Sequence, residues 1–176
     1  PGDVFLIPGR FPHAIGPGVL MLEVQEPSDW VVQPERFCAG TQLTEKDMWG
    51  PLDPETGLRC FDYSSAGGVG EILSRVKIAP VNGWSQPGAR YDRIIGPRQT
   101  DCFAVGRLTV ESSASVELDR RHHIGIATSG TGRVIIDRKT YLVSAGDSFL
   151  IPWDAGRMEC QSDSGALTIV VVSSPA

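Results

Sequence analysis

The chain has 176 residues, of which 41% are hydrophobic and 21% are charged, and its formal net charge is −5. This composition is typical of a folded protein with room for one large domain or two small ones, and it argues against a disordered chain. The basic residues form no runs, so we expect neither nucleic acid nor an anionic membrane surface as a partner.

The lack of targeting signals and the wide spacing of the cysteines both predict a cytoplasmic protein. No apolar stretch is long enough to cross a bilayer, and the N-terminus lacks the basic segment and apolar run of a signal peptide. The four cysteines are far apart and show neither CxxC nor another metal-ligand spacing. We therefore expect unpaired thiols in a cytoplasmic protein.

The first predicted element returns near the end of the chain. Residues 2–8 read GDVFLIP and residues 146–152 read GDSFLIP, with six of seven positions identical. In each copy a Gly-Asp turn leads into a short apolar strand, which a proline ends. A second apolar segment follows each copy, GVLMLEVQ from Gly18 and GALTIVVV from Gly165. The repeat predicts two similar β-sandwiches in tandem.

The first copy contains a histidine at the end of a sequence motif with fixed spacing. The stretch GDVFLIPGRFPH has glycine, five residues, proline, four residues and histidine, and it resembles the second sequence motif of cupins. After such a strand the turn can aim the imidazole of His13 inward, where neutral imidazole is a good ligand for zinc, iron or copper. We therefore predict that His13 is a metal ligand.

A carboxylate follows on the next predicted strand. Glu23 lies in an apolar run. Burying a carboxylate among apolar side chains is costly unless the carboxylate has a hydrogen-bonding or ionic partner or serves a function. Strand alternation places Glu23 on the face opposite Leu20 and Leu22. We expect Glu23 and His13 to face one cavity.

The second copy differs at both informative positions. At the offset of the repeat, Arg157 stands where the first copy has His13, and Val170 stands where it has Glu23. Arginine stays protonated and cannot act as a metal ligand. We therefore predict metal chemistry in the first copy and a metal-free scaffold in the second.

Residues 40–98 are predicted to form a connector with short helices. Thr44 or Asp47 can cap a helix that runs through Trp49, and residues 70–77 have helical spacing of their apolar side chains. Prolines and glycines mark loops in between. Trp49 and Trp84 are expected to pack this connector.

Residues 100–173 supply seven predicted strands, which are a complete small jelly roll. The strands are residues 103–110, 115–118, 124–127, 133–136, 141–143, 148–151 and 167–172. The glycines of SGTGR predict a hairpin turn between two of them. His122 and His123 are adjacent, so they point to opposite faces and cannot chelate one metal. We expect this pair at a solvated strand end.

The predicted fold class is mainly β, a cupin (RmlC-like jelly roll) β-sandwich in two tandem copies with a partly helical connector. Residues 1–39 form the C-terminal part of an incomplete first cupin, residues 40–98 the connector, and residues 99–176 a second, metal-free cupin. Because the first copy has no preceding strands here, we expect a fragment of a longer protein. The missing N-terminal strands, or a second copy in a homodimer, are the expected protein partners.

The block GDVFLIPGRFPHAIGPGVLMLEVQEPSDW resembles the central block of class I mannose-6-phosphate isomerases. That resemblance implies a zinc-dependent aldose–ketose isomerase acting on a hexose 6-phosphate. It implies that His13 is a zinc ligand and that Glu23 is a candidate proton carrier between C1 and C2. The family usually has a Tyr-Arg pair after the SD. Counting from Asp29, the arginine falls on Gln33, and the nearby Arg36 is the candidate replacement.

Two other functions stay open at the level of sequence. The first is a non-catalytic cupin that binds a sugar or sugar phosphate, which the missing Tyr-Arg pair favours. The second is a metal-dependent cupin of another chemistry, such as a dioxygenase, because one fold hosts many activities.

Overall fold

The structure is a computed structural model, which describes residues 2–26, 31–65 and 67–174. The chain divides into two compact units. One contains the residues up to Val4 together with those from Ile78 onward, and the other is Phe5–Lys77.

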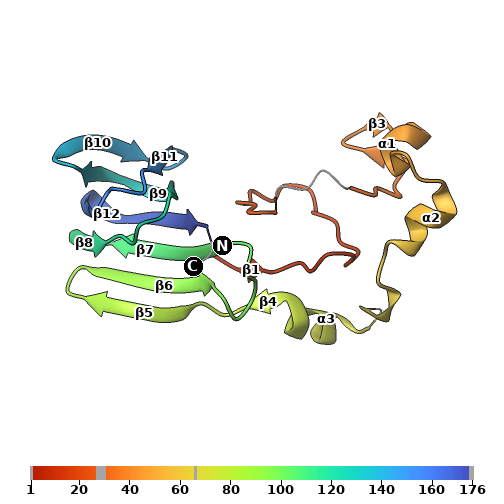
Figure 1. The fold of residues 1–176 in the computed structure, drawn as a ribbon, viewed down its shortest axis with the longest axis horizontal. Coiled ribbons are helices and arrows are strands. Elements are labelled where there is room, and N and C mark those ends of the chain that lie inside the picture. Colours follow the sequence, from red (N-terminus) through yellow and green to blue (C-terminus); the bar gives the residue numbers. More distant parts are fainter. Residues whose placement is uncertain (1, 27–30, 66, 175–176) are drawn as a thin grey trace. The chain divides into compact units, whose positions relative to one another are not determined.

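The strands, labelled in Figure 1, are β1 (Val4–Phe5), β2 (Phe37–Cys38), β3 (Thr41–Gln42), β4 (Lys77–Ile78), β5 (Val81–Gln86), β6 (Ala89–Ile95), β7 (Ala104–Val110), β8 (Ser113–Glu117), β9 (His123–Ile136), β10 (Lys139–Ser144), β11 (Ser148–Ile151) and β12 (Arg157–Ser173). The helices are α1 (Glu45–Trp49), α2 (Pro54–Arg59) and α3 (Val69–Val76), with a 3-10 turn at Tyr63–Ser65. Two small sheets pair β1 with β4 and β2 with β3.

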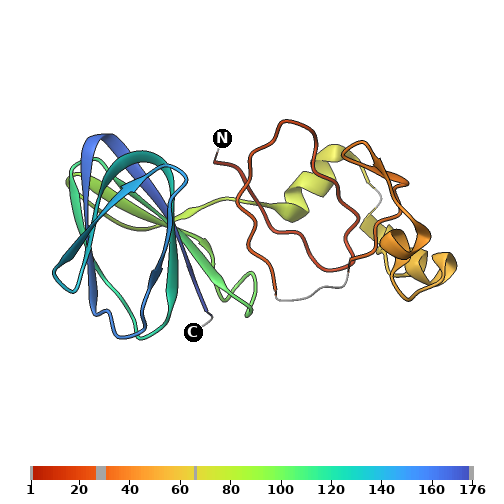
Figure 2. The ribbon, with the colours of Figure 1, turned by 90° about the horizontal axis from the view of Figure 1, so that it is seen from above.

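The unit that begins at Ile78 is built on one antiparallel sheet of eight strands. Their order is β10-β9-β12-β7-β6-β5, while β11 also pairs with β9 and β8 also pairs with β12. Each of the long strands β9 and β12 therefore has partners along both of its halves, and the sheet curls around one interior (Figure 2). The predicted mainly β fold is confirmed.

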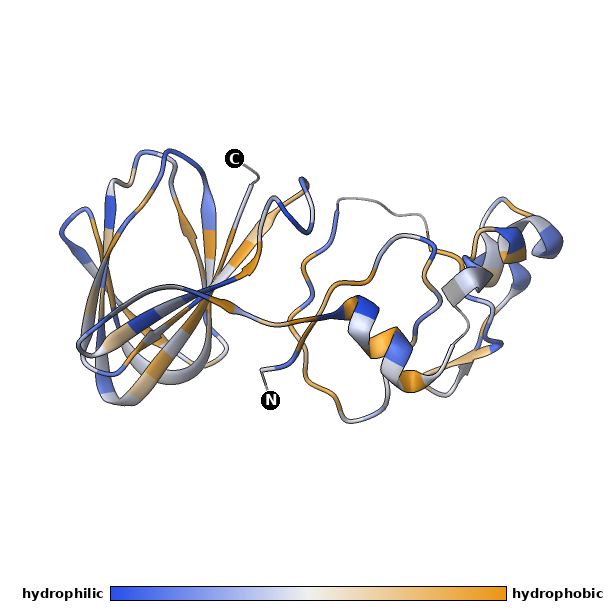
Figure 3. Cartoon of the chain, turned by 90° about the horizontal axis from the view of Figure 1, so that it is seen from below, coloured by the Kyte–Doolittle hydropathy of each residue, from blue (hydrophilic) through white to orange (hydrophobic). Residues whose placement is uncertain are grey.

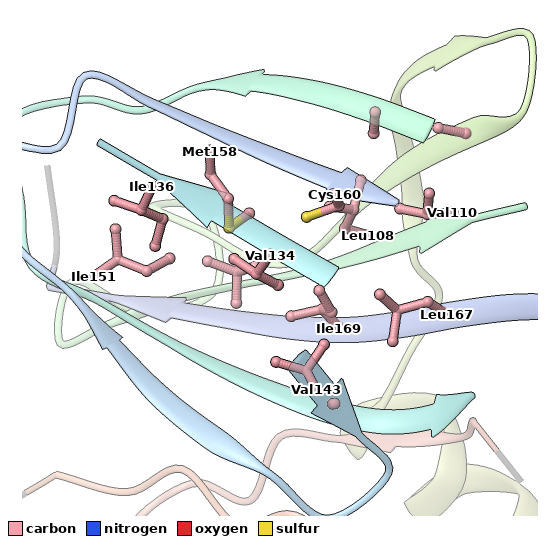
Figure 4. Packing of buried hydrophobic residues seen from close by; sticks show 14 of the residues in the cluster. Leu108, Val110, Val134, Ile136, Val143, Ile151, Met158, Cys160, Leu167 and Ile169 are labelled. Carbon is pink, nitrogen blue, oxygen red and sulfur yellow. The ribbon is translucent and has the colours of Figure 1, made fainter. Parts of the chain in front are cut away.

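The interior of this unit is a continuous apolar cluster (Figure 4). Its largest fully buried side chains are Leu108, Ile151, Met158, Leu167, Ile169, Val110, Val134 and Cys160. They come from β7, β9, β11 and β12, where alternate residues face inward. Burial raises the pKa of the Cys160 thiol to about 12, so this cysteine is an inert core residue. All four cysteines lie in the described part of the chain, and none forms a disulfide.

The hairpin predicted at SGTGR is wrong, because residues 129–133 lie inside the single strand β9. The register between β9 and β12 shifts there, at Ser162, Ser164 and Thr168 of β12. Gly130 has a φ of 78°, a left-handed conformation that favours glycine. The glycines therefore allow an irregular bend within a continuing strand rather than a turn between two strands.

Replacing Gly132 by alanine is expected to lower the free energy of unfolding by about 1–3 kcal/mol, because it overpacks this bend. A Cβ at Gly132 would lie 2.1 Å from the backbone oxygen of Gln161, which pairing holds in place. Urea unfolding measures the effect. Gly156→Ala is the control, since a Cβ there meets no atom within 4 Å. If Gly132→Ala and Gly156→Ala have equal free energies of unfolding, the inferred overpacking at Gly132 is wrong.

Strands β5 and β6 belong to the large sheet, so the compact unit begins at Ile78 rather than at residue 99. Both strands lie in residues 40–98, which were predicted as a connector, but they pair with each other through a two-residue turn. Trp84 packs against the apolar cluster and stacks on Tyr91, with ring centroids 6.0 Å apart. Trp84 therefore stabilises the sandwich and not the connector.

In the unit Phe5–Lys77 the predicted helices are present. Thr44 caps α1 by accepting from Asp47 N at 3.2 Å, and Trp49 is buried as expected. Helix α2 occupies a stretch predicted as loop, because Asp53 caps it and Pro54 fits its first turn.

The second strand predicted for the first copy is wrong, because residues 18–26 form no strand. Strands need partners for their backbone groups, and no described segment pairs with these residues. Their apolar side chains stay exposed without alternation: Val19, Met21 and Leu22 are 59%, 45% and 43% exposed, and Leu20 is fully exposed. Figure 3 shows hydrophobic residues along this irregular segment.

Candidate functional site

The loop that carries His13 is fixed by a tight turn after the repeat segment. Phe11 N donates to Pro8 O at 3.2 Å, and Arg10 between them has a φ of 69°. Arg10 is held by two further bonds: its Nε donates to Cys60 O at 3.1 Å, and its carbonyl accepts from Asp62 N at 2.8 Å. These bonds compensate for a backbone conformation that non-glycine residues rarely adopt.

The imidazole of His13 is exposed, and one of its nitrogens has a partner. Nδ1 lies 2.9 Å from Phe11 O. A carbonyl oxygen can only accept, so in the neutral ring the proton is on Nδ1 and Nε2 keeps its lone pair. Metal-ligating histidines are commonly oriented by this kind of bond. His13 therefore fits one position of a zinc site through Nε2.

A complete zinc site needs about three protein ligands and an open position. Among the described residues no group of three or more His, Cys, Asp or Glu side chains could hold a metal ion. His13 therefore fits one ligand position of such a site, and the described residues contain no group that would complete it.

The other predicted site residues lie in the same unit as His13. Glu23 and Arg36 are both exposed, and Gln33 is half-buried, with its backbone N donating to Met48 O at 2.9 Å. Within the described ranges no hydrogen bond or ion pair joins His13, Glu23 and Arg36. Asp29, from which the family arginine was counted, lies outside the described residues.

Sequence reasoning missed a second group of polar residues, at the start of β9. His123 was expected at a solvated strand end, but its side chain is buried, because its backbone pairs with Ile151 on one side and Ser173 on the other. His122 is exposed as predicted. Alternation along β9 places His123 on the inner face with Gly125 and Ala127.

Two of the three charged residues in the loop between β8 and β9, Asp119 and Arg121, form an ion pair just before His123. Arg121 Nε donates to Asp119 Oδ2 at 2.8 Å, and Arg121 Nη2 also donates to that oxygen. The hydrogen bond from Arg121 holds the pKa of the Asp119 carboxyl below its usual value. The same bond raises the pKa of Arg121. This pair is charged across the physiological pH range.

A buried carboxylate elsewhere in the sandwich is structural. Asp92 is 3% exposed and accepts from Arg90 Nε at 2.6 Å and from Arg107 Nη2 at 3.4 Å. Two arginines on the same sheet therefore neutralise it, so its burial needs no ligand.

In sequence, the chain matches a protein-family model and also individual proteins. The model of the AraC-like ligand binding domain matches residues 117–155, the stretch that contains Asp119, Arg121 and His123. Mannose-6-phosphate isomerase ManA of Bacillus subtilis is 26% identical over 163 residues, which cover 92% of this chain and 46% of that protein. GmuF of the same organism, named a probable mannose-6-phosphate isomerase, is 24% identical, covering 86% of this chain and 44% of that protein.

The chain thus spans about half the length of the curated relatives it matches. The family match and these relatives together support a relationship at the level of the cupins.

Solved structures with similar folds include cupins. An RmlC-like cupin from Shewanella frigidimarina is 16% identical, covers 55% of this chain and 85% of that chain, and has a TM-score of 0.44. A cupin-2 domain from Rhodospirillum rubrum is 11% identical, covers 56% and 70%, and has a TM-score of 0.46. In the described part of the chain, no helix is both long enough and apolar enough to span a membrane.

Proposed function

We propose that this chain is part of a zinc-dependent aldose–ketose isomerase that acts on a hexose 6-phosphate, with mannose 6-phosphate as the substrate. The observation that carries the proposal is His13, which lies in the GDVFLIPGRFPHAIG block with its Nε2 lone pair unengaged and its Nδ1 bonded to Phe11 O. The two isomerase relatives from Bacillus subtilis support it.

Three exposed side chains have roles in this proposal. His13 contributes one ligand through Nε2, and the other ligands come from protein outside the described residues. A bound zinc ion would polarise the sugar oxygens. Glu23 moves a proton between C1 and C2, which suits an exposed carboxylate that makes no ion pair in the described structure. Arg36 contributes its guanidinium to the phosphate or to the developing negative charge.

One alternative is a non-catalytic cupin that binds a sugar or sugar phosphate, which the Gln33 in place of the family arginine favours. Metal content separates the two, because a sensor needs no tightly bound zinc. A metal-dependent oxygenase is distinguished by its need for oxygen, since aldose–ketose conversion consumes none.

The test uses a longer polypeptide that contains the sequence preceding this chain. In it, Glu23→Gln is expected to lower turnover of mannose 6-phosphate by about 10²–10⁴-fold, the usual contribution of a general acid–base group. Its zinc content should not change, because the carboxylate moves a proton and does not hold the metal. The measurement is an anaerobic isomerase assay beside metal analysis.

Glu35→Gln is the matched control, because Glu35 is also an exposed glutamate of the same unit. It should keep full turnover. If Glu23→Gln turns over as fast as Glu35→Gln, Glu23 is not the proton carrier.

A further inference from the structure

The large sheet has edge strands that pair on one side only. Among the described residues these are β5, β8, β10 and β11. Unpaired backbone groups at an edge can bind another strand, and proteins usually protect them with short strands, prolines, bulges or charges. β5 contains a bulge between Asn82 and Trp84, and the short β11 is followed by Pro152. β8 has no exposed large apolar side chain. These three edges therefore offer little to a further strand.

The fourth edge, β10, lacks such protection. It pairs with β9 in regular register over its whole length, and it contains no proline. Tyr141 and Leu142 in its middle are 50% and 76% exposed. Its one charged residue, Lys139, lies at the end of the strand. β10, labelled in Figure 1, is therefore a regular edge strand with exposed apolar side chains.

The turn between β9 and β10 decides which backbone groups of β10 face outward. Asp137 and Arg138 form this two-residue turn, with φ values of 50° and 63°, as in a type I′ hairpin. The pair next to the turn then exchanges hydrogen bonds, and so does every second pair after it. Lys139, Tyr141 and Val143 therefore bond to β9. The N–H and C=O groups of the residues between them point away from β9.

Thr140 and Leu142 keep these outward groups free. Ser144 has outward groups too, but its N donates to Asp147 Oδ2 at 2.8 Å and its O accepts from Asp147 N at 2.9 Å. In the described part of the chain, neither Thr140 nor Leu142 has a comparable backbone bond outside the sheet. The free part of this edge is thus a donor and an acceptor on each of two residues, with Tyr141 between them.

This pattern is complementary to itself in an antiparallel pair. A twofold axis at Tyr141, perpendicular to the sheet, sets Thr140 opposite the partner's Leu142 and Leu142 opposite the partner's Thr140. Each of these two pairs exchanges two hydrogen bonds, four in all. The two Tyr141 side chains then lie opposite each other on one face, where cross-strand aromatic pairs stabilise a sheet. A second copy of the strand therefore satisfies every free group of the edge.

The charges at the two ends of β10 fit the same arrangement. Arg138 and Lys139 lie at its start, and neither makes an ion pair within the described ranges. Asp147 lies just beyond its end, bonded to Ser144. Antiparallel pairing sets Arg138 opposite the partner's Ser144, beside the Asp147 carboxylate, and the twofold axis repeats this contact. Such complementary charges select the orientation and the register of a pair.

We propose that β10 pairs with β10 of a second copy of this chain, so that the strands β8, β12, β9 and β10 continue as one sheet across a twofold dimer. One strand on each side is a small interface, and small interfaces form weak complexes. The dimer therefore dissociates on dilution. Every residue involved belongs to the unit that begins at Ile78, so the proposal does not depend on the isomerase function.

The test is sedimentation equilibrium of the 176-residue chain over a range of concentrations, with hydrogen exchange of the backbone amides measured by NMR on the same samples. We expect a monomer–dimer equilibrium. The amides of Thr140 and Leu142 should exchange more slowly as the concentration rises, because they become bonded only in the dimer. Those of Tyr141 and Val143 should be protected at every concentration, because they bond to β9 in both states.

Leu142→Pro removes an N–H that points outward and leaves the bonds to β9 in place. It deletes two of the four hydrogen bonds across the axis, so dimerisation should weaken by about a hundredfold, at about tenfold for each bond. Leu142→Ala is the matched control, since it shortens the same side chain but keeps the N–H. It should weaken dimerisation by less than about tenfold.

Arg138→Gly tests the charges separately. It removes the cation that faces the partner's Asp147, and glycine suits the left-handed φ of this turn, so the hairpin is retained. Dimerisation should weaken by about two- to tenfold, as expected for a pair of exposed ion pairs.

A monomer at every concentration would overturn the proposal. So would a dimer in which Thr140 and Leu142 exchange as fast as in the monomer, since the copies would then meet on another surface. Slow exchange of these two amides that is independent of concentration would also overturn it, because another part of the same chain would then cover the edge. Equal losses in Leu142→Pro and Leu142→Ala would contradict the backbone pairing.

Discussion

Ile151→Ala is expected to lower the free energy of unfolding by about 2–5 kcal/mol, the usual cost of a large-to-small change in a packed core. Ile151 is fully buried in the apolar cluster of the sandwich. Its neighbour Leu150 lies on the other face of β11 and is 63% exposed. Leu150→Ala should therefore change stability by no more than about 0.5 kcal/mol. Urea unfolding of the two variants beside the parent measures the difference.

The same substitution in the first copy of the repeat gives a second comparison. Ile7 occupies the position of Ile151 in GDVFLIP, but it is half-buried and lies outside the large sheet. Ile7→Ala should cost less than Ile151→Ala, because less apolar surface returns to water. If Leu150→Ala costs as much as Ile151→Ala, the inner and outer faces of β11 are wrongly assigned.

His13→Ala is expected to abolish tight zinc binding and isomerase turnover in the longer polypeptide. Removal of one ligand from a site of about three leaves too few to retain the ion. Metal analysis after dialysis measures the first effect, and conversion of mannose 6-phosphate measures the second. His122→Ala, which changes an exposed histidine of the other unit, should keep both.

In the 176-residue chain by itself the same substitution should change almost nothing. One imidazole holds zinc only weakly, so we expect little bound metal and little turnover with or without His13. We also expect the unit from Ile78 onward to hold no metal, since Arg157 replaces the histidine of the repeat. Stoichiometric zinc in the short chain would show that the metal site lies elsewhere or is completed by a second copy.

Local signals in the sequence predicted the elements that depend on local chemistry. The cap at Thr44 and the hydrophobic spacing of α3 were sufficient for those helices, because a helix satisfies its own backbone groups. The repeat GDSFLIP predicted β11 with its observed bounds. Glycine and proline, in contrast, were ambiguous. They suggested a hairpin inside β9 and a loop at Pro54 and Gly57, whereas the first lies in a bend of one strand and the second in helix α2.

The candidate site shows the same division. The spacing of GDVFLIPGRFPH makes His13 a candidate ligand, and the structure adds the contact of Nδ1 with Phe11 O that orients its ring. Nothing local to ELDRRHH distinguishes His123 from His122. Only the pairing of β9 with β11 and β12 buries one of them and leaves the other exposed.

By itself the sequence determined the β class of the fold, the repeat and the helix cap at Thr44, because each depends on residues close together in the chain. Tertiary structure alone decided that residues 18–26 form no strand, that β5 and β6 join the sandwich, and that His123 lies beside Asp119 on its inner face. The physical reason is that a strand satisfies its backbone only through a neighbour, and the neighbour is chosen by segments far away in sequence.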